Sequence, residues 1–147
     1  MQLKGLVVLV VEDDPDNLEL LSSHLEGEGA TVVGAASIAA ALAMTSGVTL
    51  SALLSDLELP DGDGCELLRR LRERDGRNLP AIALTGYSDA KWRSRAMNCG
   101  FERYAVKPFA LSQVSEWLNE LTDRKSGVGV ATCPSVTDPA APARRAR

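Results

Sequence analysis

Six polar residues stand where apolar segments of the chain end, and their chemistry is complementary. They are Glu12, Asp13, Asp14, Asp56, Thr85 and Lys107. Clustered carboxylates repel one another and raise one another's pKa unless a cation lies among them, and oxygen ligands with open water positions suit Mg²⁺. A carboxylate beside Mg²⁺, with a lysine and a hydroxyl available for further anionic oxygens, is equipped to receive a phosphoryl group.

The elements that must position these residues alternate along the chain. Apolar runs typical of strands cover residues 5–11, 31–36, 50–55, 79–84 and 104–106. A helical segment follows each run, and Asp14 and Ser37 are good N-caps for the first two helices. Five strand–helix units predict an α/β fold with an open parallel sheet and helices on both faces. The carboxyl ends of the strands then meet at one edge, where such sheets bind their ligands.

Composition and charge exclude several functional classes. The 147 residues carry 16 basic and 20 acidic side chains, and residues 1–124 alone hold 12 basic against 19 acidic ones, a net charge of −7. An acidic body disfavours nucleic acid as a partner. No apolar run approaches the roughly 20 residues that span a bilayer, so we expect neither membrane insertion nor an export signal.

The cysteines and the C-terminal segment bear on location and domain organisation. Cys65, Cys99 and Cys133 are odd in number, widely spaced and never in a CxxC pair. This pattern argues against a disulfide framework and a zinc site, and it favours a cytoplasmic location with Cys65 and Cys99 facing the core. Because residues 125–147 are rich in Gly, Pro, Ala and Ser without apolar periodicity, we expect one domain (1–124) and a disordered tail or linker (125–147).

The spacing of these residues resembles that of the response-regulator receiver domain, the CheY-like phosphoacceptor module of two-component signalling. The similarity covers about residues 5–124. An acidic pair follows the first strand, and the segment from Asp56 to Gly64 keeps the family's order of aspartate, proline and Asp-Gly. The remaining matches are Thr85-Gly86, Tyr104 and Lys107-Pro108.

This resemblance implies a fold and a role for each residue. The fold is flavodoxin-like, a doubly wound five-stranded parallel sheet, (βα)5, with strand order 2-1-3-4-5. Asp56 would be the phosphoacceptor, and Lys107 and Thr85 its catalytic partners. Thr85 and Tyr104 would be the switch residues. The implied Mg²⁺ ligands are Asp13, Asp14, Asp56 and the main-chain carbonyl of Glu58.

The same resemblance implies the partners. The phosphoryl donor would be a histidine kinase or a phosphotransfer protein, and a downstream protein would dock on the surface of the fourth helix, fifth strand and fifth helix. The domain would promote its own phosphorylation and dephosphorylation without being a turnover enzyme. A stand-alone regulator and a receiver of a larger hybrid kinase both stay open.

Two alternatives stand beside the receiver. Asp56 and Glu58 imitate the nucleophile and acid–base pair of a phosphohydrolase of the haloacid-dehalogenase type. That family, however, places its nucleophile after the first strand and needs further chain for a substrate cap. A pseudoreceiver that serves only as a docking module is disfavoured because the acidic residues are complete.

Overall fold

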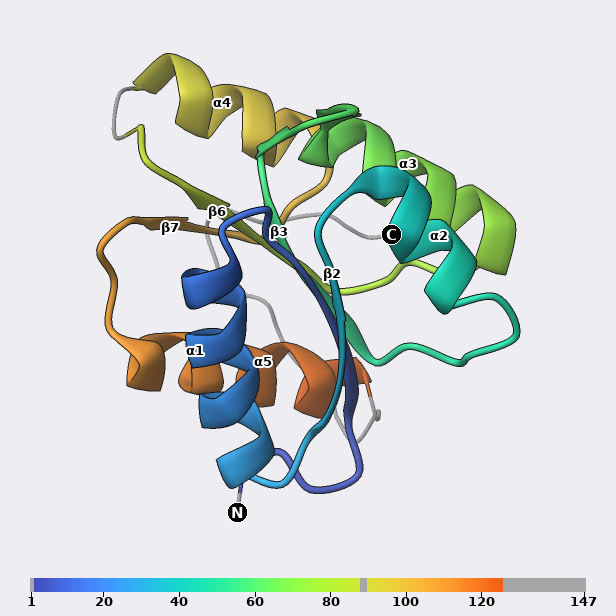
Figure 1. Ribbon diagram of the computed structural model, residues 1–147, viewed down its shortest axis with the longest axis vertical. Coiled ribbons are helices and arrows are strands. Elements are labelled where there is room, and N and C mark those ends of the chain that lie inside the picture. Colours follow the sequence, from blue (N-terminus) through green and yellow to red (C-terminus); the bar gives the residue numbers. More distant parts are fainter. Residues whose placement is uncertain (1, 88–89, 126–147) are drawn as a thin grey trace.

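A computed structural model describes residues 2–87 and 90–125 (Figure 1). The strands of its main sheet are β1 (Val7–Val11), β2 (Thr31–Ala35), β3 (Ala52–Asp56), β6 (Ala81–Thr85) and β7 (Arg103–Val106). The helices are α1 (Pro15–Gly27), α2 (Ile38–Met44), α3 (Gly64–Asp75), α4 (Ala90–Cys99) and α5 (Leu111–Lys125). A short antiparallel hairpin, β4 (Glu58–Leu59) with β5 (Gly62–Asp63), lies between β3 and α3.

The main sheet is parallel throughout, in the order β2-β1-β3-β6-β7. Counting only these five strands, this is the predicted order 2-1-3-4-5, which is therefore confirmed. The register pairs Asp56 with Leu84 and Thr85 with Val106. The carboxyl ends of β3, β6 and β7 consequently lie at one edge of the sheet, as the alternation of strands and helices predicts.

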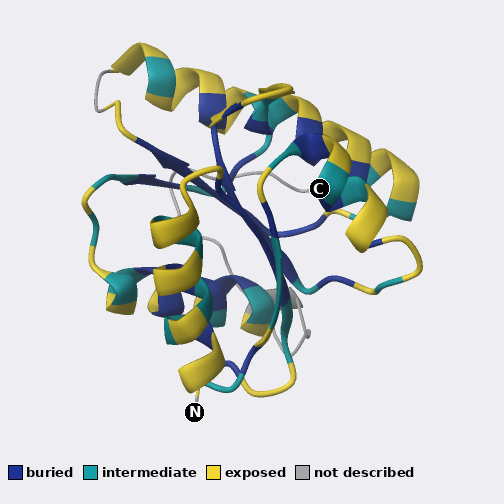
Figure 2. Ribbon diagram, in the orientation of Figure 1, coloured by how far each residue is buried: buried dark blue, intermediate teal, exposed yellow. Residues whose placement is uncertain are grey.

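Two helix layers cover the sheet, α1 with α5 on one face and α2, α3 and α4 on the other (Figure 1). Strand β1 serves both layers, because Val8 and Val10 belong to one buried apolar cluster and Leu9 and Val11 to the other. Figure 2 shows the inner strands of the sheet buried, the edge strand β2 partly buried and the outer helix faces exposed. A strand packed on both faces needs apolar residues at every position, and this explains the continuous apolar run of the sequence.

Polar side chains fix where the helices begin. Asp14 caps α1 and accepts a hydrogen bond from the amide of Asp16, while Ser37 caps α2, so both predicted caps are confirmed. Asp63 caps α3 by accepting from the amide of Glu66 at 2.9 Å. Each cap satisfies one of the amide groups that the first turn of a helix leaves without a partner.

Cys65 and Cys99 pack against the core as predicted, but the prediction that the cysteines form no disulfide was wrong. A disulfide joins Cys65, the second residue of α3, to Cys99, the last residue of α4, with 5.7 Å between their Cα atoms. Both residues are half-buried at the rim of the core. The pairing was hidden because the two cysteines are 34 residues apart in the sequence and approach only when α3 and α4 pack. Cys133 lies outside the described residues.

Helix α5 continues through Lys125, and the rest of the predicted tail, residues 126–147, lies outside the described part of the chain. Within that described part, none of the helices combines the length and the apolar character needed to cross a bilayer.

We predict that Gly64→Ala destabilises the fold. An added Cβ at Gly64 would lie 2.6 Å from the main-chain oxygen of Asp56, so the start of α3 or the end of β3 would have to move. Overpacking of this kind costs about 1–3 kcal/mol of unfolding free energy. Urea unfolding followed by circular dichroism measures the change. Gly27→Ala in α1 is the matched control, because a Cβ there meets nothing within 4 Å; equal stability of the two variants would contradict the prediction.

Candidate functional site

The ammonium group of Lys107 holds together the carboxyl ends of three strands. Its Nζ atom lies 2.9 Å from Oδ2 of Asp56 at the end of β3 and 2.8 Å from Oε1 of Glu12, which follows β1. Lys107 itself follows β7, and the peptide bond that joins it to Pro108 is cis. The predicted pairing of Asp56 with Lys107 is therefore present in the structure, and Glu12 joins it.

Three carboxylates converge at this edge of the sheet. One oxygen from each of Glu12, Asp13 and Asp56 lies within 4.8 Å of the other two. Glu12 is 1% exposed and Asp56 8% exposed, whereas Asp13 faces solvent. Asp14, which the sequence analysis named as a metal ligand, is not in this cluster, because its carboxylate caps α1 instead. Glu12 takes the inward position, and its amide still pairs with the carbonyl of Ala35 on β2, as the residues of β1 do.

Burial and charge act against each other at this cluster. Burial raises the pKa of the Glu12 carboxyl above its ordinary value, although the Lys107 ammonium and the amide of Asp14 act in the opposite direction. For Lys107, burial alone would lower the pKa, but its contacts with Glu12 and Asp56 raise it. The lysine therefore keeps its charge at neutral pH, and the carboxylates around it outnumber it three to one.

The β4–β5 hairpin holds the second oxygen of Asp56. The amide of Glu58 donates a hydrogen bond to Asp56 Oδ1 at 3.1 Å. Asp61 anchors the hairpin, because its two carboxylate oxygens accept hydrogen bonds from the amides of Ile38 and Ala39 at the start of α2. These two amides lower the pKa of Asp61. The chain that follows Asp56 is thus fixed to α2, a contact that the sequence pattern did not indicate.

Thr85 and Tyr104, the predicted switch residues, are both buried and both contact the main chain of Tyr87. The hydroxyl oxygen of Thr85 accepts from the amide of Tyr87 at 3.1 Å, and the Tyr104 hydroxyl donates to the carbonyl of Tyr87 at 2.6 Å. The guanidinium of Arg93 lies 5.1 Å from the centre of the Tyr104 ring. Tyr87 therefore connects the two predicted switch residues, a role that sequence reasoning missed because it belongs to backbone atoms.

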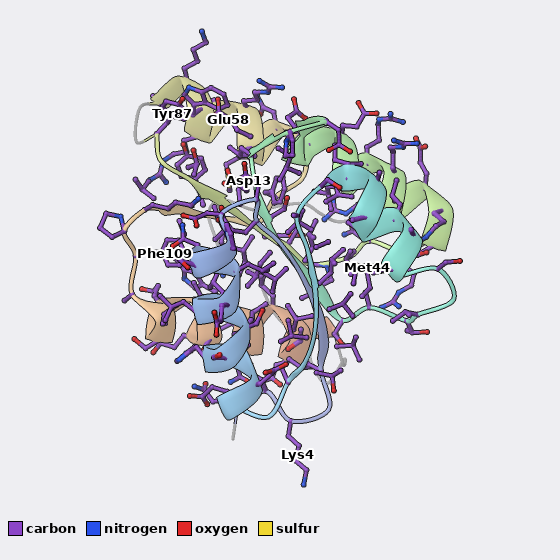
Figure 3. The ribbon with its side chains drawn as sticks, viewed as in Figure 1. Lys4, Asp13, Met44, Glu58, Tyr87 and Phe109 are labelled. Carbon is purple, nitrogen blue, oxygen red and sulfur yellow. A yellow bond between two sulfur atoms is a disulfide. The ribbon has the colours of Figure 1, made fainter. Side chains whose placement is uncertain are left out.

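The side chain of Tyr87 continues this connection outward. Its hydroxyl donates to the carboxylate of Glu58 at 3.3 Å, and its ring stacks on Trp92 of α4 with 4.7 Å between centroids. The negative charge of Glu58 raises the pKa of Tyr87. Asp13, Glu58 and Tyr87 all lie at the end of the molecule opposite Lys4 (Figure 3). The site is therefore in contact with α4 through one aromatic residue.

The donor set fits a divalent cation. Three carboxylates and one lysine leave two negative charges in a partly buried site. The buried Oε1 atom of Glu12 forms the ion pair with Lys107, and no other partner for it is found among the described residues. Hard oxygen ligands of this kind, open to water on the Asp13 side, suit Mg²⁺. The arrangement is consistent with a divalent metal site at the carboxyl edge of the sheet.

A comparison with protein families places the chain. The family model described as "Response regulator receiver domain" matches residues 8–119, so the chain belongs to the response-regulator receiver family. Receiver domains are signalling modules of two-component systems rather than turnover enzymes, and they partner with histidine kinases. The acidic cluster of Glu12, Asp13 and Asp56 lies where this family has its active site.

Individual relatives agree with this assignment. An uncharacterised 14.6 kDa protein of Leptolyngbya boryana is 44% identical over 102 residues, which are 69% of this chain and 78% of that protein. The sensor protein EvgS of Escherichia coli O157:H7 is 34% identical over 116 residues, 79% of this chain but only 10% of EvgS. The crystal structure of a CheY-like receiver domain protein from Methanospirillum hungatei superimposes with a TM-score of 0.74 at 31% identity, covering 85% of this chain and 99% of that one.

The raised pKa of Glu12 gives a pH-dependent prediction. A raised pKa means that the folded protein holds this proton more tightly than the unfolded chain. The resulting stability is present below the unfolded pKa and is lost as the pH rises through the folded one. In EDTA, wild type should therefore lose unfolding free energy relative to Glu12→Gln as the pH rises above the ordinary glutamate pKa of about 4.3.

Urea titrations at several pH values measure this difference. Glu19→Gln is the control, because it removes an exposed carboxylate close by on α1. Parallel stability curves for wild type and Glu12→Gln, or a wild type that gains relative stability with pH, would contradict the assignment of the buried carboxyl.

Proposed function

We propose that the chain accepts a phosphoryl group from a phosphohistidine donor onto Asp56 in a reaction that requires Mg²⁺. The observation that carries this proposal is the contact of the Asp56 carboxylate with the Lys107 ammonium inside a cluster of three carboxylates. A carboxylate held in this way is a nucleophile whose charge the Lys107 ammonium partly offsets before the phosphoryl group arrives.

The reaction follows from the groups that surround Asp56. A bond would form between an Asp56 oxygen and phosphorus, and the bond between phosphorus and the donor's imidazole nitrogen would break. Lys107, freed from its contact with Asp56 Oδ2, would pair with a phosphoryl oxygen. Mg²⁺, when bound, supplies positive charge beside the other phosphoryl oxygens. The proton for the leaving imidazole would come from solvent on the exposed Asp13 side.

We assign the metal to Asp13, Asp56 and the main-chain carbonyl of Glu58, with Glu12 as the inner carboxylate. The sequence analysis gave Asp14 this place. We propose Glu12 instead, because the Asp14 carboxylate already accepts hydrogen bonds at the start of α1, from the amide of Asp16 and the side chain of Asn17.

The donor would be a histidine kinase or a phosphotransfer protein, and the response would reach a downstream protein through the surface of α4, β7 and α5. We propose Thr85 and Tyr104 as the switch, since a Thr85 hydroxyl drawn to the phosphoryl group would release the Tyr87 amide that it now accepts from. The carbonyl of Tyr87 accepts the hydrogen bond of the Tyr104 hydroxyl, so a movement of Thr85 and a movement of Tyr104 would be coupled through Tyr87. Residues 126–147, the part of the predicted tail beyond α5, would be a tail or a linker outside this domain.

Asp13→Asn should weaken Mg²⁺ binding by about tenfold or more, because it removes a full charge from a hard-cation site. Asp14→Asn is the matched control: asparagine is also a good N-cap, so this variant keeps α1 while removing the neighbouring charge. Isothermal calorimetry with MgCl₂ measures both affinities. An equal loss in the two variants would show that nearby negative charge, and not coordination by Asp13, attracts the ion.

Incubation with acetyl phosphate and Mg²⁺ should add one phosphoryl group to the protein, detected by intact mass spectrometry. Asp56→Asn should abolish the addition, as should EDTA. Asp16→Asn, which removes an exposed carboxylate in the first turn of α1, is the control and should be labelled like wild type. Labelling of Asp56→Asn would exclude Asp56 as the acceptor, and repeated turnover of small phosphate esters would indicate a phosphohydrolase instead.

A further inference from the structure

The disulfide between Cys65 and Cys99 joins α3 to α4, next to the hairpin that follows Asp56. Cys65 lies at the start of α3, directly after the hairpin that follows Asp56, and Cys99 ends α4. Figure 1 shows the end of α4 beside the start of α3. The Cα separation of 5.7 Å is within the range of about 4.4–6.8 Å that a disulfide spans. No backbone movement is therefore required to make this bond.

The packing of α3 against α4 accommodates both the disulfide and the two reduced thiols. The sulfur atom of Cys65 lies 3.9 Å from the carbonyl oxygen of Arg95, and that of Cys99 lies 3.3 Å from the carbonyl oxygen of Ala96. Reduced thiols would therefore find hydrogen-bond acceptors without rearrangement. Both cysteines also line an open groove of about 600 Å³ together with charged side chains, among them Glu66 and Arg69. The pair is therefore within reach of a small reagent from solvent, unlike a cysteine in the core.

A second set of contacts connects the start of α3 to α4 and then to the functional site. Asp63, the cap of α3, forms an ion pair with Arg95 of α4. The Arg95 guanidinium lies 5.6 Å from the centre of the Trp92 ring, and Trp92 stacks on Tyr87. Tyr87 in turn binds Glu58, two residues after Asp56. Thus α4 is joined covalently at its end to the start of α3, and its side chains contact the acceptor loop, residues 57–63 between Asp56 and α3.

We propose that Cys65 and Cys99 are a reversible dithiol–disulfide pair, and that oxidation restrains α4 against α3. The oxidant would be a small disulfide of the glutathione class. In the balanced exchange, two cysteine thiols and one small disulfide give the Cys65–Cys99 disulfide and two small thiols, which carry away both protons and both electrons. An excess of the small thiol reverses the reaction.

The restraint has a direct effect on α4 and a further one on signalling. A crosslink that closes a chain segment of 34 residues limits how far α4 can separate from α3 during local opening. The effect on signalling rests on the proposed function: if phosphorylation moves α4 through Tyr87, the oxidised protein should show less of that movement.

Mapping of free and bonded cysteines tests the pairing of Cys65 with Cys99. The full chain carrying Cys133→Ser, which removes the third cysteine, is equilibrated with mixtures of reduced and oxidised glutathione, alkylated, and mapped by mass spectrometry. We expect one internal disulfide between the peptides of Cys65 and Cys99, fully reversed by reduced glutathione. Mixed disulfides with glutathione in place of the internal bond, or thiols that stay free in oxidised glutathione, would overturn the proposal.

Amide hydrogen exchange tests the restraint in the absence of any phosphodonor. In the oxidised protein, exchange in residues 90–99 should be slower by about tenfold or more than in the same protein reduced, while residues 15–27 of α1 change less. Because both states come from one sequence, a folding defect cannot imitate the result. Cys65→Ser in the same background is the control: its remaining Cys99 can form only a mixed disulfide, so oxidised glutathione should not slow the exchange of α4 in this variant. Equal exchange of α4 in the two states of the parent would overturn the restraint.

A third measurement separates this proposal from the proposed function. Acetyl phosphate and Mg²⁺ are added to the oxidised and the reduced protein, and phosphorylation and α4 exchange are both recorded. Equal phosphorylation with a smaller α4 response in the oxidised protein supports the link to signalling, and an equal response overturns it. Absence of phosphorylation in both states would contradict the role of Asp56 but leave the thiol chemistry and the restraint, measured without phosphodonor, as they stand.

Discussion

One buried ion cluster constrains the whole carboxyl edge of the sheet. Glu12 and Asp56 are almost fully buried and carry the same charge, and the ammonium of Lys107 lies between them and offsets part of it. Because the three residues follow β1, β3 and β7, the cluster forms only when the strands take the order that places β1 beside β3 and β7 two strands away. One lysine cannot balance three carboxylates, and this deficit of positive charge makes the site attractive to a divalent cation.

The same cluster is the start of a continuous set of contacts toward α4. Asp56 is held by the amide of Glu58, and the Glu58 carboxylate is held by Tyr87. The backbone of Tyr87 contacts both Thr85 and Tyr104, and its ring stacks on Trp92. A change of charge at Asp56 thus meets groups that are already in contact with the helix surface. These contacts can shift an equilibrium between two conformations only by the difference in their free energy between the two conformations. For a few hydrogen bonds, that difference is on the order of a few kcal/mol.

The sequence predicted the fold and most of the site because both depend on strong local signals. Strands buried on two faces must be continuous apolar runs, and residues at the ends of parallel strands must meet at one edge. What could not be predicted depends on single-residue geometry. Whether Glu12 or Asp14 turns inward depends on where β1 ends and α1 begins, and the two-residue strands of the hairpin are too short to show periodicity. The cysteine pair was misjudged because the contact between α3 and α4 brings together residues that no spacing rule connects.

The two flanks of the acceptor loop are fixed by different kinds of contact, and this determines where movement can occur. On one side, Asp61 binds the hairpin to the start of α2 through two amide hydrogen bonds. On the other, the start of α3 is bound to the end of α4 by the disulfide. Near the beginning of α4, the ring of Trp92 stacks on that of Tyr87. A helix held covalently at its end and by stacking near its beginning can move most at its beginning. In the oxidised protein, α4 would therefore pivot about Cys99, whereas in the reduced protein it could also shift along α3.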